Sequence, residues 1–236
     1  MTSPARKHFL KASAAAQAAQ SQQDAPQTGD AYQLMKVALL EDRRRLHDVQ
    51  SIERKIELKR ELLPQYQEYI DGVLDAGKGA QDDVLTTLMV WHLDVGQLNI
   101  AVAIGEYVLE HDLNTPEEYQ RKPAAVLLED AAEAILRKDI KPVWKQGSIE
   151  NRIIPDGDQG IDAVEDLKLL ARIAALTEKH DMHDQVRAKL FKASGYLQAL
   201  LGDYRLALDN LERAKSLNEH AGVKKDIENL QRLVNE

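Results

Sequence analysis

Residues 191–214 read FKASGYLQALLGDYRLALDNLERA, and this stretch decides the fold class because its apolar spacing is helical on both sides of Gly202. The helices that we expect here cover residues 184–201 and 204–218. Small residues at 195, 207 and 214 allow two paired helices to approach closely, and large apolar side chains fill the space between them. The stretch therefore predicts an antiparallel helical hairpin.

The spacing within this hairpin resembles a tetratricopeptide repeat. The residues that carry the resemblance are Phe191, Gly195, Gly202, Tyr204, Ala207, Leu211 and Ala214. Residues 91–113 repeat the pattern weakly, and two such units are fewer than the three or so stacked repeats that a solenoid needs. We therefore expect separate helical hairpins with a partner-binding groove, in which Phe191, Tyr204 and Leu211 are the predicted contact residues.

The composition extends the helical prediction to the whole chain. Among 236 residues, 12 are Gly, 7 are Pro and 5% are aromatic, which leaves little material for β-sheets. We predict an all-α protein. The absence of Cys excludes disulfide frameworks, thiolate metal sites and cysteine nucleophiles. No apolar run approaches the roughly 18 residues of a membrane span, and the N-terminus lacks a signal-peptide core, so we expect a soluble, intracellular protein without a membrane partner.

Charge is distributed unevenly along the chain. The formal net charge is −8, but residues 1–60 carry +4 and residues 61–236 carry −12. This asymmetry indicates that any contact with nucleic acid lies near the N-terminus, whereas the acidic remainder is better suited to a protein partner. A long helix with simply solvated mixed charges is the alternative.

The first 30 residues predict a flexible N-terminal arm. A basic stub is followed by an Ala/Gln/Ser-rich tract that contains almost no large apolar side chains after Leu10, so this segment cannot bury a core. Such a terminus either orders on a polyanion or remains an unstructured end of the chain.

Residues 31–64 predict one long helix that ends at Pro64. Heptad spacing aligns a mostly apolar stripe, in which Leu39, Leu46, Val49 and Ile56 are the predicted oligomerisation residues. Packing of the stripe on the chain's own body is an equal alternative. The other faces are basic. With the arm they supply the predicted DNA-binding residues: Arg6, Lys7, Lys11, Arg43, Arg44, Arg45, Arg54, Lys55 and Lys59.

The rest of the chain divides into three parts. Residues 65–139 predict a central helical domain with a hairpin around Gly96, and residues 140–160 are rich enough in Gly and Pro to form a linker loop. Residues 161–236 predict the C-terminal, tetratricopeptide-like domain. We therefore expect the boundary between the two halves at residues 140–160.

Acidic residues offer weak candidates for a catalytic site. Asp82 and Asp83 form a carboxylate pair, and Asp156 and Asp158 lie in a sequence that partly matches a calcium loop. Capping of the next helix explains the first pair better, and a polar loop explains the second. We predict no metal site and no tightly bound cofactor, with magnesium needed only if the chain itself cuts DNA.

Several sequence strings resemble the small terminase subunit of temperate contractile-tailed phages. They are MTSPARKHF at 1–9, RELLP at 60–64, GKGAQDDV at 77–84, DQVRAKL at 184–190 and AGVKK at 221–225. The resemblance spans nearly the whole chain, and this family is usually labelled the terminase endonuclease subunit.

The resemblance implies a role in packaging phage DNA. It implies that the protein binds the cohesive-end site of concatemeric double-stranded DNA, assembles into homo-oligomers, in some arrangements a ring, and delivers the DNA to a large ATPase subunit in the cytoplasm of the bacterial host. The residues themselves fit DNA binding but contain no recognisable nuclease motif. Two alternatives stay open at this point, namely a metal-dependent endonuclease that itself cuts the site and a non-enzymatic helical scaffold.

Overall fold

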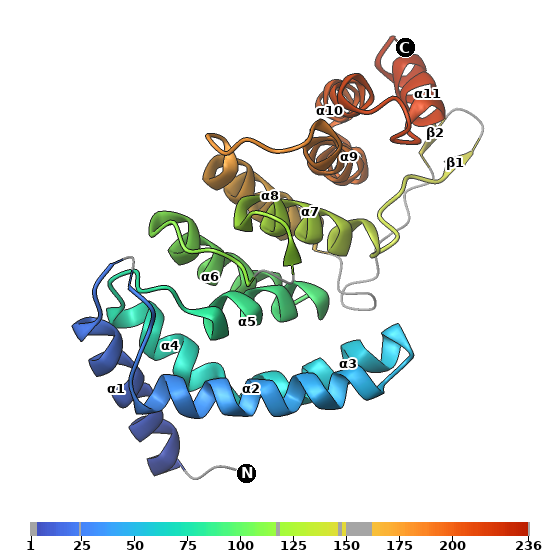
Figure 1. The fold of residues 1–236 in the computed structure, drawn as a ribbon. Helices are drawn as coiled ribbons and strands as arrows, with labels where there is room; N and C mark the ends of the chain where they lie inside the picture. The colour runs from blue at the N-terminus through green and yellow to red at the C-terminus, as the bar shows by residue number, and fades with distance from the viewer. Residues whose placement is uncertain (1–3, 24, 117–118, 146–147, 150–161, 236) are drawn as a thin grey trace. The chain divides into compact units, whose positions relative to one another are not determined.

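The computed structural model describes residues 4–23, 25–116, 119–145, 148–149 and 162–235. These residues form two compact units, Met1–Pro123 and Ala124–Glu236, and each is treated by itself. Eleven α-helices occur among the described residues, with one short 3-10 helix and two strands of two residues each (Figure 1). The all-α prediction is therefore confirmed.

The first unit contains six α-helices and the 3-10 helix. They are α1 (Pro4–Gln20), α2 (Asp30–Asp48), α3 (Ile52–Leu62), η1 (Leu63–Gln65), α4 (Gln67–Ala76), α5 (Asp83–Asp94) and α6 (Leu98–Glu110). Fully buried apolar side chains from η1 to α6 form its core, among them Ile70, Leu88 and Ile104. The α5–α6 hairpin turns at Gly96, whose φ of +77° is accessible to glycine at little cost.

The first 30 residues differ from the flexible arm that we predicted. Helix α1 packs on α4, and its Ala14 and Ala18 are each 1% exposed. A Cβ added at Gly72 would lie 2.5 Å from the carbonyl oxygen of Lys11, so the two helix backbones are in close contact. Small residues therefore allow a segment without large apolar side chains to be buried, which the sequence argument did not consider.

The linker after α1 is also tied to the body of this unit. The backbone N–H of Gln27 donates to the carbonyl oxygen of Gln81 at 2.8 Å, and the N–H of Gln81 donates to the carbonyl of Ala25 at 2.8 Å. These bonds form an isolated parallel bridge centred on Pro26. Because each partner is backbone, the bridge holds the linker beside the α4–α5 connection whatever its side chains are.

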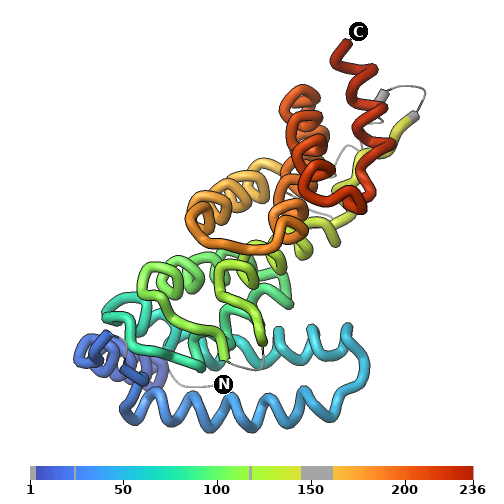
Figure 2. Tube along the Cα trace, turned by 45° about the horizontal axis from the view of Figure 1, so that its top comes forward, coloured from blue at the N-terminus to red at the C-terminus, as the bar shows by residue number. Residues whose placement is uncertain are grey.

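The long helix predicted for residues 31–64 is two antiparallel helices, α2 and α3 (Figure 2). The backbone becomes extended at Val49, with φ −88° and ψ 127°, and the side chain of Ser51 then caps α3 by accepting a hydrogen bond from the N–H of Arg54 at 3.4 Å. Serine is a favoured residue at this capping position. The break brings cations from both helices to one side of the unit.

The second unit contains five α-helices and a minimal β-hairpin. They are α7 (Pro123–Leu136), β1 (Trp144–Lys145), β2 (Ser148–Ile149), α8 (Ala163–Thr177), α9 (Asp184–Leu200), α10 (Tyr204–Leu217) and α11 (Lys224–Asn235). The α9–α10 hairpin forms as predicted, and a Cβ on Gly195 would come within 2.7 Å of the Leu211 side chain. The boundary between units lies at residue 123 rather than at 140–160.

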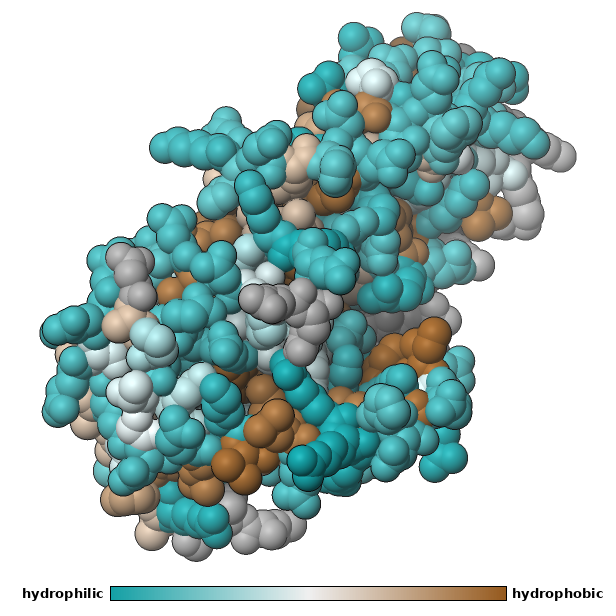
Figure 3. All heavy atoms as spheres, viewed as in Figure 1, coloured by the Kyte–Doolittle hydropathy of each residue, from teal (hydrophilic) through white to brown (hydrophobic). Residues whose placement is uncertain are grey.

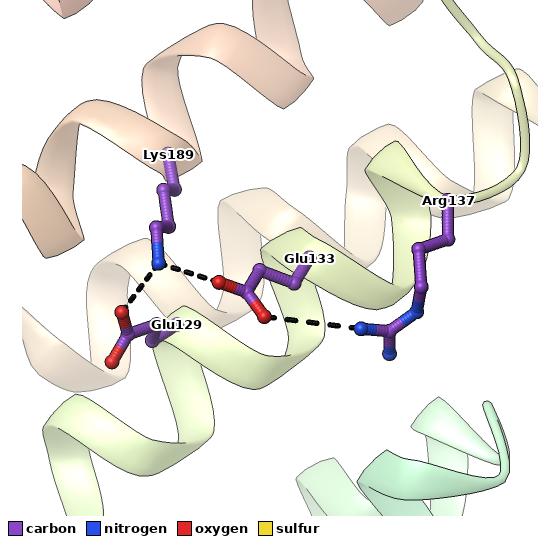
Figure 4. Close-up of polar contacts among 4 residues, drawn as sticks. All are labelled: Glu129, Glu133, Arg137 and Lys189. Carbon is purple, nitrogen blue, oxygen red and sulfur yellow. Dashed lines mark hydrogen bonds and ion pairs between the residues drawn. The ribbon is translucent and has the colours of Figure 1, made fainter. Parts of the chain in front are cut away.

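Ionic contacts link α7 to α9 within the second unit. Lys189 of α9 donates to Glu129 and Glu133 of α7, each at 2.5 Å, and Arg137 pairs with Glu133 at 3.8 Å (Figure 4). Burial lowers the pKa of Lys189, but the hydrogen bonds to the two carboxylates outweigh it, so the pKa is raised. The helix that we assigned to a central domain is thus fastened to α9.

A buried carboxylate anchors the last helix. Asp226 of α11 is 2% exposed, and it accepts hydrogen bonds from the indole N–H of Trp144 and the hydroxyl of Tyr196, each at 2.9 Å. Lys141 adds an ion pair at 3.6 Å. These contacts join the β-hairpin, α9 and α11 within the second unit. No helix in the described part of the chain combines the length and apolar character needed to cross a membrane.

Candidate nucleic-acid interface

A shallow groove of about 320 Å³ collects cations on the first unit. It lies where the C-terminal half of α2 faces α3 and α5. Its lining residues are Arg43, Leu46, His47, Lys55, Lys59, Trp91 and Tyr119. Because α2 and α3 are antiparallel, cations that are more than ten residues apart in the sequence line the same groove. We call this surface the basic groove.

Two of its cations are held in place by neighbours. The guanidinium of Arg43 donates to the hydroxyl of Thr87 on α5 at 2.8 Å, and Lys59 forms an ion pair with Asp94 at the end of α5. The ammonium of Lys59 also lies 5.7 Å from the ring centroid of Trp91, within the range of a cation–π contact. These contacts orient the two side chains before any ligand binds, which reduces the entropy lost on binding.

Two other lining residues, His47 and Lys55, extend toward solvent. The side chain of His47 is 90% exposed, and Lys55 is half-buried on the first turns of α3. A flexible ammonium on a long stem can follow a phosphate backbone without strict geometry. The basic groove thus combines two oriented cations, Arg43 and Lys59, with the adaptable ammonium of Lys55, and His47, Trp91 and Tyr119 also line it.

A buried polar network centres on Asp42, which precedes the groove residue Arg43 in α2. The sequence did not predict this network. Asp42 is 4% exposed and accepts hydrogen bonds from the hydroxyl of Tyr66 at 2.7 Å, from Gln65 at 2.6 Å and from Arg45 at 3.1 Å. Burial raises the pKa of Tyr66, and the hydrogen bond to Asp42 raises it further. The available signal was an aspartate between the apolar positions 39 and 46 of the heptad stripe.

The predicted cations of α1 lie outside the groove. Lys7 pairs with Glu68 at 3.9 Å, and Lys11 pairs with Asp75 at 2.7 Å. The hydrogen bond from Lys11 to Asp75 is the main cause of the raised pKa of Lys11. Arg6 lines a separate groove between α1 and α2. The α1 cations therefore bind acidic side chains of α4 or lie beside another surface.

The remaining predicted cations are distributed around the groove. Arg45 is engaged by Asp42, while Arg44 and Arg54 are exposed on the outer surfaces of α2 and α3. Of the nine predicted DNA-binding residues, the structure thus gathers Arg43, Lys55 and Lys59 in one place. His47, which we did not predict, joins them.

Comparison with known proteins identifies the family. The family model for the phage small terminase subunit matches residues 36–185, which include α2 from residue 36 onward and all of α3. The chain belongs to the phage small terminase subunit family. It is 38% identical over 232 residues to the protein named "Terminase, endonuclease subunit" of Escherichia phage P2, covering 98% of this chain and 85% of that protein. No solved structure matched.

The apolar stripe predicted to oligomerise this terminase subunit lies partly in its own core. Leu39 is 4% and Leu46 is 8% exposed, and both face the first unit, while Val49 and Ile56 are half-buried. The alternative reading, in which the stripe packs on the chain's own body, therefore holds for α2. The helix break at Val49 explains the outcome because it folds α3 back beside α2.

The predicted partner-binding residues also occupy different environments. Leu211 is fully buried against Gly195, so it belongs to the core of the α9–α10 hairpin and our assignment of it to a partner surface was wrong. Phe191 and Tyr204 are half-buried, and Arg213 lies 6.0 Å from the Phe191 ring. Only these two keep surface that a partner could contact.

The weak catalytic candidates that the sequence offered have structural roles where the structure describes them. One oxygen of Asp82 accepts the N–H of Leu85, at 2.8 Å, and the other accepts the hydroxyl of Tyr69. Burial raises the pKa of Asp82 to about 6, although both hydrogen bonds favour the ionised form. Asp82 is thus the cap of α5, with both oxygens engaged.

The other carboxylates add no convergent site. Asp83 accepts a hydrogen bond from Gln81 at 3.1 Å, and Asp156 and Asp158 lie outside the described residues. Among the residues that the structure describes, no three His, Asp or Glu side chains lie close enough together to hold a metal ion.

Proposed function

We propose that this small terminase subunit binds double-stranded phage DNA through the basic groove and delivers it to the large ATPase subunit. The observation that supports this most is the convergence of the cations Arg43, Lys55 and Lys59 at one groove of an otherwise acidic protein. Cations that neutralise phosphates release counterions, and this release supplies most of the sequence-independent affinity for DNA. The proposal includes recognition of the cohesive-end site of concatemeric DNA in the host cytoplasm.

The acidic second unit is the better candidate for contact with the large subunit. Phe191 and Tyr204 keep part of their aromatic surface on the α9–α10 hairpin of this unit, which a protein partner could contact. We also propose that the protein acts as a homo-oligomer, because several copies of the subunit must assemble at one DNA site.

Cleavage is proposed to require the large subunit. The P2 relative is named an endonuclease subunit, which keeps cutting by this chain as a second candidate function. The geometry of Asp82 favours the first reading because this carboxylate is buried and each of its oxygens already accepts a hydrogen bond that fixes the start of α5 or Tyr69, whereas a catalytic magnesium needs carboxylates open to water and substrate. Magnesium would be needed here only if the chain itself cut DNA.

The test measures DNA affinity at several salt concentrations by fluorescence anisotropy, with a cohesive-end duplex and a scrambled duplex. Lys55→Gln should reduce the magnitude of the salt slope by about 0.9, the value for one lost phosphate contact. Lys215→Gln on the exposed surface of α10 is the matched control and should leave the slope unchanged. Equal effects of the two substitutions, or none at Lys55, would place the DNA surface elsewhere.

The same duplex separates the two candidate functions. Incubation of the protein alone with magnesium should leave the cohesive-end duplex intact, and cutting should appear only after the large subunit and ATP are added. Cutting by the protein alone, abolished by Asp82→Asn or Asp83→Asn, would instead establish a nuclease in this chain.

A further inference from the structure

The outer face of α2 carries apolar side chains that the first unit does not cover. Leu34 and Leu40 are each 50% exposed and Val37 is 63% exposed (Figure 3, brown along α2). The opposite side of the same helix is buried through Met35 and Leu39. Helix α2 is therefore apolar on two sides, and a surface helix that only covers a core needs one apolar side.

Leu34 and Val37 lie on a stripe with the spacing of a helix–helix seam. Asp30, Leu34, Val37, Glu41 and Arg44 alternate in steps of four and three, which keeps them on one stripe of the helix, and Leu40 flanks it. Asp30 and Arg44 stand at the two ends of the stripe, and both are exposed. We call the surface formed by Asp30, Leu34, Val37, Leu40 and Arg44 the α2 outer face.

The charges at its ends make this face complementary to itself in one orientation. If two copies of α2 cross antiparallel with Val37 opposite Val37, then Leu34 lies opposite Leu40 and Asp30 lies opposite Arg44. The two charged ends are fourteen residues apart, which is about 21 Å along a helix. A parallel pair would place Asp30 against Asp30 and Arg44 against Arg44, and like charges at these positions repel.

We propose that the α2 outer face binds the same face of a second copy of this chain, as an antiparallel pair of α2 helices around a two-fold axis. A two-fold interface uses the same patch on both subunits, which is what a self-complementary stripe provides. This inference rests on the self-association proposed above and names its surface. The surface is distinct from the heptad stripe that the sequence indicated, whose α2 residues are buried.

An adjoining groove extends the apolar surface. Phe9 of α1 is 71% exposed, and with Leu34 it lines a groove of about 440 Å³ between α1 and α2. A second copy that covers the α2 outer face would also meet the mouth of this groove. The α2 outer face and this groove together offer more apolar surface than α2 alone, and a stable interface between proteins buries a large area.

The test measures the molecular mass of the full chain, without DNA, by sedimentation velocity over a range of concentrations. Val37→Glu places two carboxylates opposite each other on the axis, so we expect dimer affinity to fall by at least about tenfold. Ile52→Glu is the matched control because Ile52 is 75% exposed but lies outside the face, at the start of α3. It should leave the mass unchanged. Circular dichroism and melting curves verify that each variant is folded.

A charge exchange tests the orientation. Asp30→Arg and Arg44→Glu should each weaken the dimer because each opposes like charges, and the double variant should restore it by reversing both signs. A wild type that stays monomeric would overturn the proposed self-association as well as this inference. An oligomer that survives Val37→Glu, or a double variant no better than the single ones, would overturn this interface alone, and DNA affinity measured on the same variants would still test the basic groove.

Discussion

Substitution of Gly72 by Ala distinguishes a docked α1 from the flexible arm that the sequence indicated. Gly72 is buried where α4 contacts α1, and the added Cβ would lie 2.5 Å from the carbonyl oxygen of Lys11 and 3.0 Å from the backbone nitrogen of Ala15. Both neighbours are backbone atoms, so no side-chain rotation relieves the overlap. Helix α1 must shift by about 1 Å or separate from α4.

The two possibilities predict opposite signs for the change in stability. Overpacking at a tight contact costs about 1–3 kcal/mol, and replacing a helical glycine by alanine returns about 1 kcal/mol. With α1 docked we therefore expect a net loss of up to about 2 kcal/mol. If α1 were a mobile arm, only the helix-propensity gain would remain and the variant would be more stable.

Amide hydrogen exchange measures this effect locally. In the Gly72→Ala variant the amides of α1 should lose protection by about tenfold, which corresponds to about 1.4 kcal/mol, while those of α5 retain theirs. Urea unfolding gives the global free energy for comparison. Unchanged protection of α1, together with a stability gain of about 1 kcal/mol, would refute the close packing of α1 on α4.

Three further substitutions test the buried polar groups. Asp82→Asn keeps the cap of α5 but removes a carboxyl whose folded pKa of about 6 exceeds its unfolded value near 4. The free energy of unfolding of the wild type should therefore fall by up to about 3 kcal/mol as pH rises from 4 to 6, whereas that of the variant should not. Urea titrations at each pH measure this difference, with Asp83→Asn as the control. A variant that keeps the wild-type pH profile contradicts this assignment. Tyr196→Phe removes a donor to the buried carboxylate of Asp226 and should cost about 1–3 kcal/mol by thermal unfolding, whereas a neutral result would mean that water replaces the hydroxyl. Lys189→Met leaves two carboxylates of α7 without their shared cation and should lower the free energy of unfolding by about 1 kcal/mol. An equally stable variant would show that apolar packing holds α7 and α9 together.

Local patterns predicted those parts of the fold whose causes are local. The α5–α6 hairpin follows from an apolar stripe on each side of Gly96, and the α9–α10 hairpin follows from the spacing around Gly202. Asp82 or Asp83 was expected to cap a helix, and Asp82 caps α5. In each case the determining residues lie within about two helical turns of one another, so one sequence window contains them.

The features that were missed depend on contacts between distant segments. The end of α2 at Val49 has no Gly or Pro to mark it, and only the capping of α3 by Ser51 reveals it. The docking of α1 depends on Gly72, some sixty residues from the alanines that it contacts. Small residues give a weak signal because helix contact through them needs no apolar bulk.

The candidate site was predicted only in part. The sequence identified its Lys and Arg residues as candidates. Which of them lie together depends on the reversal of chain direction at Val49, and the prediction of one continuous helix missed this reversal. His47 enters the basic groove for the same reason. The buried Asp42 was visible as a polar interruption of the stripe, yet its partners, Gln65 and Tyr66, come from η1 and the residue after it.

The two tryptophans of the chain provide a separate optical probe for each unit. Trp91 is 3% exposed in the first unit, with its ring edge-on to Tyr66, whereas Trp144 donates its indole N–H to Asp226 in the second. Replacing either one by Phe leaves a single emitter, so the unfolding of each unit can be followed in the intact protein. Because Trp91 also lines the basic groove, its emission should respond to DNA bound there, while that of Trp144 reports what happens at the last helix.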